Sequence, residues 1–238
     1  MKYEKTEKYH TDLINQKIMW PNPLKLEEEL LKDIKIKSGS IVMDLGSGQG
    51  ITSIFLVKEY GFKVYATDLW SDPEENRKFF TEMGLTDEQI IPVKADATDL
   101  KYEKEFFDAV ISTDSYNYFG RDENFLDEKL LPFVKKGGYI YIVVPGMKKD
   151  LHHNLPKELL LSWTPEQLDY IHDIEYWKNI ISKSQDSEII SIHEMESNED
   201  CWNDWIKCDN EYSQNDKKAI DAGACQYLNF IAMILRKK

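Results

Sequence analysis

The sequence predicts an α/β fold in which helices cover both faces of a doubly wound, parallel sheet. Two observations carry this prediction. β-branched and apolar runs alternate with segments of helical character, and glycines stand where the helices would end. Within 238 residues, this regular alternation favours one domain over several.

The first element, residues 1–39, lies ahead of the sheet and has two parts. Apolar residues near helical spacing over 24–34 predict a helix. Residues 18–23 contain two prolines and are predicted to be non-helical. This stiff apolar segment has two interpretations: it folds over a ligand cleft, or it packs on the sheet as ordinary core.

The sheet and its covering helices follow in regular order. Gly61 and Gly84 stand at helix C-caps, and Gly137 with Gly138 makes the turn into the fifth strand. The predicted strands cover 40–45, 62–67, 90–95, 107–113 and 138–144, and the predicted helices cover 49–60, 73–83 and 122–134.

The turn after the first strand is the most informative element. An apolar run ends at Asp44-Leu45 and breaks into Gly46, Gly48 and Gly50. Glycines without a Cβ let the backbone approach a ligand closely, and the following helix presents free N–H groups at its N-terminus. A dinucleotide fingerprint would need glycine where Ile51 stands, and no P-loop is present. The turn therefore predicts a nucleotide-like ligand other than NAD.

Two further strands end in acids. Asp68 ends the second strand, where its carboxylate can accept hydrogen bonds from both hydroxyls of a ribose, and Asp96 follows the third. Asp72 precedes Pro73 and offers a separate N-cap for the next helix, which would leave Asp68 free for a ligand. The alternatives are a capping role for Asp68 and a solvated turn for Asp96.

The glycine turn, the two strand-terminal acids and the strand 107–112 occur in one order, and together they resemble the four motifs of the class I S-adenosylmethionine-dependent methyltransferases. Residues 18–145 carry the resemblance, which is to the bacterial small-molecule branch related to the cyclopropane-fatty-acid-synthase-like and ubiquinone/menaquinone-type groups. It implies S-adenosylmethionine as cofactor and S-adenosylhomocysteine as product. It also implies a Rossmann-like seven-stranded sheet with an antiparallel C-terminal hairpin, for which 188–193 and 227–235 are available.

The resemblance also implies a set of cofactor-binding residues. Asp96 and Ala97 would meet the adenine, and the segment around Trp20 would meet the methionine half. The full set is Met19, Trp20, Pro21, Asp44, Gly46, Ser47, Gly48, Gly50, Asp68, Leu69, Asp96, Ala97 and Thr113.

Methyl transfer from a sulfonium is an in-line displacement, so the protein's task is alignment and exclusion of water. A base is needed only if the acceptor must lose a proton. Asp114 and Tyr116 are the catalytic candidates, and Tyr116 and Tyr118 are expected to line the path to the methyl group. The segment 113–119 departs from the Asp-Pro-Pro-Tyr motif of amino-methylating nucleic-acid enzymes.

Two segments, 146–173 and 194–221, exceed what the minimal fold needs, and long loops in compact domains are usually functional. The second is rich in acids, and Trp202 and Trp205 share one face of its predicted helix. Aromatic rings beside acids suit a cationic or aromatic substrate. The alternative is a solvated helix whose tryptophans face the core. Together with residues 1–23 this segment is predicted to close as a lid, with Tyr9, Trp20, Tyr118, Trp202 and Trp205 as substrate-side candidates.

Composition excludes several classes of partner. The formal net charge of -13 disfavours nucleic acids and anionic membranes. The longest apolar run, 139–145, is too short to span a bilayer and the N-terminus has no apolar signal core, so a cytoplasmic protein is expected. The three cysteines have neither disulfide nor metal-ligand spacing, so no metal is expected.

These observations predict a methyltransferase that acts on a small molecule. Two alternatives remain open: a protein or peptide methyltransferase, and a non-catalytic regulatory protein that binds S-adenosylmethionine. The oligomeric state is left open.

Overall fold

A seven-stranded sheet forms the centre of the computed structural model, which describes residues 2–9 and 11–238. Its strand order is β3-β2-β1-β4-β5-β7-β6; β1 to β5 are parallel, and β7 runs antiparallel to β5 and β6. The predicted α/β fold with its C-terminal hairpin is confirmed. The strands are β1 Ile41–Leu45, β2 Lys63–Asp68, β3 Ile90–Lys94, β4 Phe107–Thr113, β5 Val134–Met147, β6 Ser187–Glu194 and β7 Leu228–Lys237.

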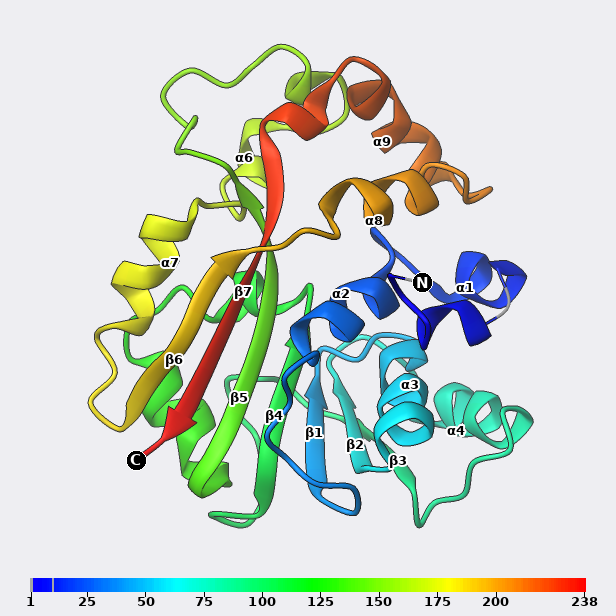
Figure 1. The fold of residues 1–238 in the computed structure, drawn as a ribbon, viewed down its shortest axis with the longest axis vertical. Coiled ribbons are helices and arrows are strands. Elements are labelled where there is room, and N and C mark those ends of the chain that lie inside the picture. The colour runs from blue at the N-terminus through cyan, green and yellow to red at the C-terminus, as the bar shows by residue number, and fades with distance from the viewer. Residues whose placement is uncertain (1, 10) are drawn as a thin grey trace.

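The helices form two layers and a group beyond one end of the sheet. One core lies between the sheet and α2, α3, α4 and α8, and the other between the sheet and α5 and α7. Figure 1 shows α8 next to α2, with α9 beyond α8 at the top of the view. The α-helices are α1 Thr11–Lys17, α2 Pro23–Leu30, α3 Ile51–Tyr60, α4 Pro73–Glu82, α5 Tyr116–Phe119, α6 Pro165–Leu168, α7 Ile174–Ile181, α8 Asn198–Trp205 and α9 Glu211–Asp221.

None of the helices in the described part of the chain is both long enough and apolar enough to cross a membrane.

Strand β1 marks the point where the strand order reverses. It pairs with β2 on one side and with β4 on the other, so connections leave it in opposite directions. Ligands of open α/β sheets bind at the carboxyl ends of the strands at such a point. The register pairs Leu45 with Thr67 and Asp44 with Ile111, which brings the residues after β1, β2 and β4 to one edge.

Local signals account for two of the helix starts. Asn22 caps α2: its Oδ1 accepts from the N–H groups of Leu24 at 3.1 Å and Lys25 at 3.4 Å, and Pro23 occupies the first helical position. The helix ends at Leu30, short of the predicted 34. Asp72 caps α4 by accepting from the Glu74 N–H at 2.8 Å, as predicted.

Two predicted elements were wrong. The α-helix predicted over 122–134 is replaced by a π-helical turn, Leu126–Leu130, and a 3₁₀ turn, Leu131–Phe133, because Pro132 has no N–H for a continuing α-helix. Strand β5 begins at Val134 and not after Gly137 and Gly138, which form a bulge within it.

The two predicted lid segments pack against each other. The Asn22 N–H donates to the Cys201 carbonyl at 3.3 Å, and Lys25 pairs with Asp204 at 2.6 Å. The Trp20 and Trp202 rings lie 5.6 Å apart. The predicted lid region 1–39 includes residues 1 and 10, which lie outside the described residues. Closure on a ligand stays a prediction.

Candidate active site

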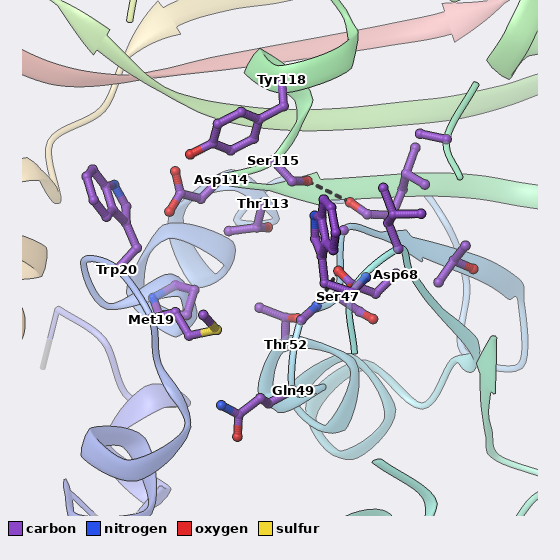
Figure 2. Close-up of a pocket in the computed structure, with 18 of the residues that line it drawn as sticks. Met19, Trp20, Ser47, Gln49, Thr52, Asp68, Thr113, Asp114, Ser115 and Tyr118 are labelled. Carbon is purple, nitrogen blue, oxygen red and sulfur yellow. Dashed lines mark hydrogen bonds between the residues drawn. The ribbon is translucent and has the colours of Figure 1, made fainter. Parts of the chain in front are cut away.

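A cavity of about 670 Å³ opens at the carboxyl ends of the parallel strands; we refer to it as the edge cavity. Its walls come from the segment before α2, the turn after β1, the ends of β2 and β3, and the segment after β4 (Figure 2). The predicted site residues that line it are Met19, Trp20, Gly46, Ser47, Gly48, Asp68, Leu69, Asp96, Ala97, Thr113, Asp114 and Tyr118.

The glycine turn presents bare backbone to this cavity. Gly48 has φ +52, and a Cβ added there would meet no atom within 4 Å, so the space beside it opens into the cavity. Gly50 differs: a Cβ there would overlap the Phe80 ring, and the residue does not line the cavity. Gly50 is also the N-cap of α3 and has no side chain to satisfy the first N–H groups. The turn therefore offers room beside Gly48, and α3 begins without a side-chain cap, whereas Gly50 serves helix packing.

Asp68 holds the turn in place. Its Oδ2 accepts from the Gly48 N–H at 3.0 Å, and its Oδ1 accepts from the N–H groups of Trp70 and Ser71, both at 2.8 Å. The prediction that Asp68 stays free was therefore wrong, although Asp72 does cap the helix. A carboxylate has roughly four acceptor positions, so Asp68 keeps capacity for one further donor.

Asp44 lies beneath the turn and not on the cavity wall. Its Oδ2 accepts from the hydroxyls of Thr52 at 2.7 Å and Ser53 at 2.5 Å. Burial raises the pKa of Asp44 to about 6, against the lowering effect of the two hydroxyl bonds, and the nearby Asp68 raises it further. Asp44 thus fixes the first turn of α3 relative to β1.

Two residues mark the rim at the ends of β2 and β3. Asp96 is exposed, and its Oδ1 accepts from the Thr98 hydroxyl at 2.7 Å and the Thr98 N–H at 2.8 Å, which lowers its pKa. Trp70 lines the cavity with 86% of its surface exposed. The sequence analysis did not single out Trp70, because only the fold turns it toward the cavity.

The backbone of the segment after β4 is strained where this segment lines the cavity. Asp114 has φ +57, a conformation that costs a non-glycine residue about 1–3 kcal/mol. Two bonds hold it: the Asp114 N–H donates to the Val143 carbonyl at 2.9 Å, and the Ser115 hydroxyl donates to the Leu45 carbonyl at 2.8 Å. Strain retained at a cavity wall supports a functional position for Asp114.

The Asp114 carboxylate points between Trp20 and Tyr118 (Figure 2). No residue that the structure describes donates a hydrogen bond to it, and burial raises its pKa well above the usual range. An anion in this position lacks compensation. Asp114 thus lines the edge cavity, and its catalytic role stays a prediction.

Glu27 is a site feature that the sequence analysis missed. It is fully buried on α2, where its Oε1 accepts from the Thr113 hydroxyl at 3.1 Å and its Oε2 has no partner among the described residues. Burial, together with the charge of Asp44, raises the pKa of Glu27 well above its usual range, against the lowering effect of the Thr113 hydrogen bond. The sequence did contain a signal for its burial: Glu27 stands three residues after Leu24, on the apolar face of the predicted helix.

Tyr116 and Tyr9 do not lie on the cavity. Tyr116 is buried in the second core, with its ring 5.7 Å from Phe125 and 5.9 Å from Trp177. Tyr9 packs on Phe55 at 5.4 Å in the first core. Their predicted places on the wall of the substrate path were wrong.

The tryptophans of α8 are also core residues. Trp205 is fully buried, and its Nε1 donates to Asp216 Oδ2 at 2.9 Å. Trp202 is buried behind Trp20. Pro21 is likewise buried and lines neither cavity. The alternative of a helix with its tryptophans on the core is therefore correct.

A second cavity of about 420 Å³ shares Met19, Trp20 and Tyr118 with the edge cavity; we refer to it as the aromatic cavity. The two segments beyond the minimal fold supply most of the remaining wall. These residues are Ser162, Trp163, Glu166, Gln167, Tyr170 and Ile171 from the first segment, Tyr212, Asn215 and Asp216 from the second, and Asn117 and Pro145 from the core.

Over the described residues, no three His, Cys, Asp or Glu side chains are grouped so as to hold a metal ion.

Comparisons with known proteins match this arrangement. The family described as "Methyltransferase domain" matches residues 43–142. A sarcosine/dimethylglycine N-methyltransferase of Aphanothece halophytica is 29% identical over 130 residues, which cover 53% of this chain and 45% of the relative. The match thus spans less than half the length of that relative.

Two solved structures share the fold. A putative sarcosine dimethylglycine methyltransferase of Galdieria sulphuraria superposes with a TM-score of 0.67 at 16% identity, covering 90% of this chain and 87% of that one. Haemonchus contortus phosphoethanolamine N-methyltransferase 2, bound to phosphomonomethylethanolamine and S-adenosylhomocysteine, gives 0.70 at 15% identity, covering 100% of this chain and 60% of that one.

Proposed function

Because this chain belongs to the class I S-adenosylmethionine-dependent methyltransferases, we propose that it transfers a methyl group to a small molecule bound in the aromatic cavity. One observation carries the small-molecule part of the proposal: two adjoining cavities share a wall of Met19, Trp20 and Tyr118. Such a wall brings two ligands together at one place. A cavity of about 420 Å³ suits a compact acceptor.

The edge cavity fits S-adenosylmethionine. Two features of the cavity support this: the open space beside Gly48 leaves room for a ligand close to the backbone, and the carboxylates of Asp68 and Asp96 on the lining are hydrogen-bond acceptors for hydroxyl and amino groups. In this proposal Asp68 holds the ribose, Asp96 and Ala97 meet the adenine, and Met19 and Trp20 face the methionine half. When bound, the cofactor supplies an electrophilic methyl: a lone pair of the acceptor forms the new bond to carbon while the carbon–sulfur pair stays on sulfur.

The chain's own residues align the acceptor and exclude water. Trp20 and Tyr118 close the space between the cavities with apolar ring surface, which strengthens electrostatic interactions there. The Asp114 carboxylate lies between these rings and can orient an acceptor group or take up its proton. Glu27 and Asp44 lie behind the wall and support the residues that form it.

Calorimetry with S-adenosylhomocysteine, followed by a screen of metabolites for S-adenosylhomocysteine release from S-adenosylmethionine, tests the proposal. We expect micromolar-range binding and turnover with members of the small-molecule pool. Turnover restricted to a protein or peptide fraction would replace this proposal with the second alternative. Tight cofactor binding without turnover in either pool would indicate a regulatory binder.

A further inference from the structure

We infer that the aromatic cavity selects a small acceptor that carries an ammonium group and no anionic group, an inference that rests on the proposed function. Two features of the cavity lining support this selection, its aromatic rings and the signs of its charges, and the Asp114 carboxylate of the edge cavity adds to them.

Aromatic side chains form much of the lining. Trp20 and Trp163 have ring centroids 6.4 Å apart, and Tyr118 and Tyr170 have centroids 5.4 Å apart. Tyr212 completes the set from α9. The faces of such rings attract a cation, and several rings around one ammonium group raise the effect.

Among the described residues, the lining holds an unpartnered acceptor, Asn117 Oδ1, beside two unpartnered donors, Trp20 Nε1 and Trp163 Nε1. Asn117 is 1% exposed, and its Oδ1 has no hydrogen-bond partner among the described residues. Asp216 is buried and also lines the cavity, with its Oδ2 held by the Trp205 N–H. The Asp114 carboxylate lines the edge cavity and lies beside the shared residues Trp20 and Tyr118. A buried anion without a counter-charge is unfavourable, and an ammonium group, quaternary or protonated, would supply that charge.

No basic residue opposes these acids in the lining. The described lining contains Glu166 and Asp216 but no Lys, Arg or His. Arg121, which stacks on Tyr170 at 4.2 Å, is outside the lining and pairs with Asp169 at 3.1 Å. A carboxylate or phosphate on the acceptor would therefore meet like charge and no counter-ion.

This feature separates the chain from the proteins it resembles. Sarcosine and dimethylglycine, for which the matched relative is named, carry a carboxylate, and phosphomonomethylethanolamine carries a phosphate. Arg and Lys are the side chains that most often bind such groups, and the described lining has neither. The acceptor of this chain is thus an amine of a different class.

Three probes of similar size test the selection in the presence of saturating S-adenosylhomocysteine. They are choline, its uncharged isostere 3,3-dimethylbutan-1-ol, and dimethylglycine, each titrated by calorimetry or ligand-observed NMR. We expect choline to bind at least tenfold more tightly than either of the other two. Equal binding of choline and the isostere, tighter binding of dimethylglycine, or no choline binding would overturn the inference.

Matched variants test whether residues of the two cavities cause the preference for choline. Asp114→Asn should reduce the preference for choline over the isostere at least fivefold. Glu105→Gln is its control, because Glu105 is also a carboxyl residue at positive φ, +54, and lies outside both cavities. Tyr212→Leu, at a side chain 63% exposed, tests the rings without disturbing the core and should also weaken choline binding. Unchanged discrimination in both cavity variants would contradict the assignment.

The titration with S-adenosylhomocysteine distinguishes failure of the ammonium inference from failure of the proposed function. If S-adenosylhomocysteine binds and the probes do not discriminate, the ammonium inference fails and the proposed function stands. If S-adenosylhomocysteine does not bind, the proposed function fails and the inference fails with it.

Discussion

Gly48→Ala tests whether the turn after β1 receives the cofactor. An alanine at φ +52 carries about 1–2 kcal/mol of strain. The turn could relieve it only by moving, yet Gly48 donates to Asp68 at 3.0 Å and its carbonyl accepts from Ser71 at 2.6 Å and Asn76 at 3.0 Å. These three bonds are worth about 3–5 kcal/mol together, one of them being to a charged group. The turn therefore stays in place, and the new methyl group projects into the edge cavity.

Gly84→Ala is the matched control. Gly84 has φ +77, also meets no atom within 4 Å of an added Cβ, and lines neither cavity. Both variants should lose about 1–2 kcal/mol in the free energy of unfolding, measured by urea titration. Only Gly48→Ala should weaken S-adenosylhomocysteine binding, by tenfold or more, which is about 1.4 kcal/mol. A dissociation constant within twofold of wild type, with the same loss of stability as Gly84→Ala, would refute the placement of the ligand.

Three further outcomes are expected. Asp68→Ala should weaken S-adenosylhomocysteine binding by about 1.5–3 kcal/mol in calorimetry, and Asp68→Asn by less, since an acceptor remains; equal losses would contradict this. Asp44 has a pKa raised from 3.8 to about 6 in the fold, so its stabilising contribution is complete below pH 4 and lost as the pH rises through 6. The stability of wild type relative to Asp44→Asn should fall by about 2 kcal/mol between pH 4 and pH 7, and a constant difference would count against it. Glu27→Gln should be more stable than wild type at pH 8 but not at pH 4. The pKa of Glu27 is raised in the fold, so burying this side chain is unfavourable at a pH where it is ionised in the unfolded chain. Glu28→Gln is the control and should show no such gain, because the Glu28 carboxylate accepts three hydrogen bonds.

The sequence by itself determined the order of elements and the edge of the sheet where ligands bind. Apolar periodicity and turn residues act over a few positions, so they identify β1, the glycine turn and the cap of α4 without knowledge of the rest. Parallel strands then bring their carboxyl ends together, which places Gly48, Asp68 and Asp96 at one cavity. The C-terminal hairpin followed from the resemblance and is present.

The tertiary structure alone decided which side chains face the cavities. Tyr116 and Tyr118 are two residues apart on one helix, which separates their directions by roughly 200°, so Tyr116 is a core residue and Tyr118 lines the cavity wall. Where α5 begins is decided by contacts with distant strands, since the Asp114 N–H is held by β5 and Ser115 by β1. The burial of Glu27 and the aromatic cavity likewise arise between segments far apart along the chain, where no local pattern records which neighbour will be met.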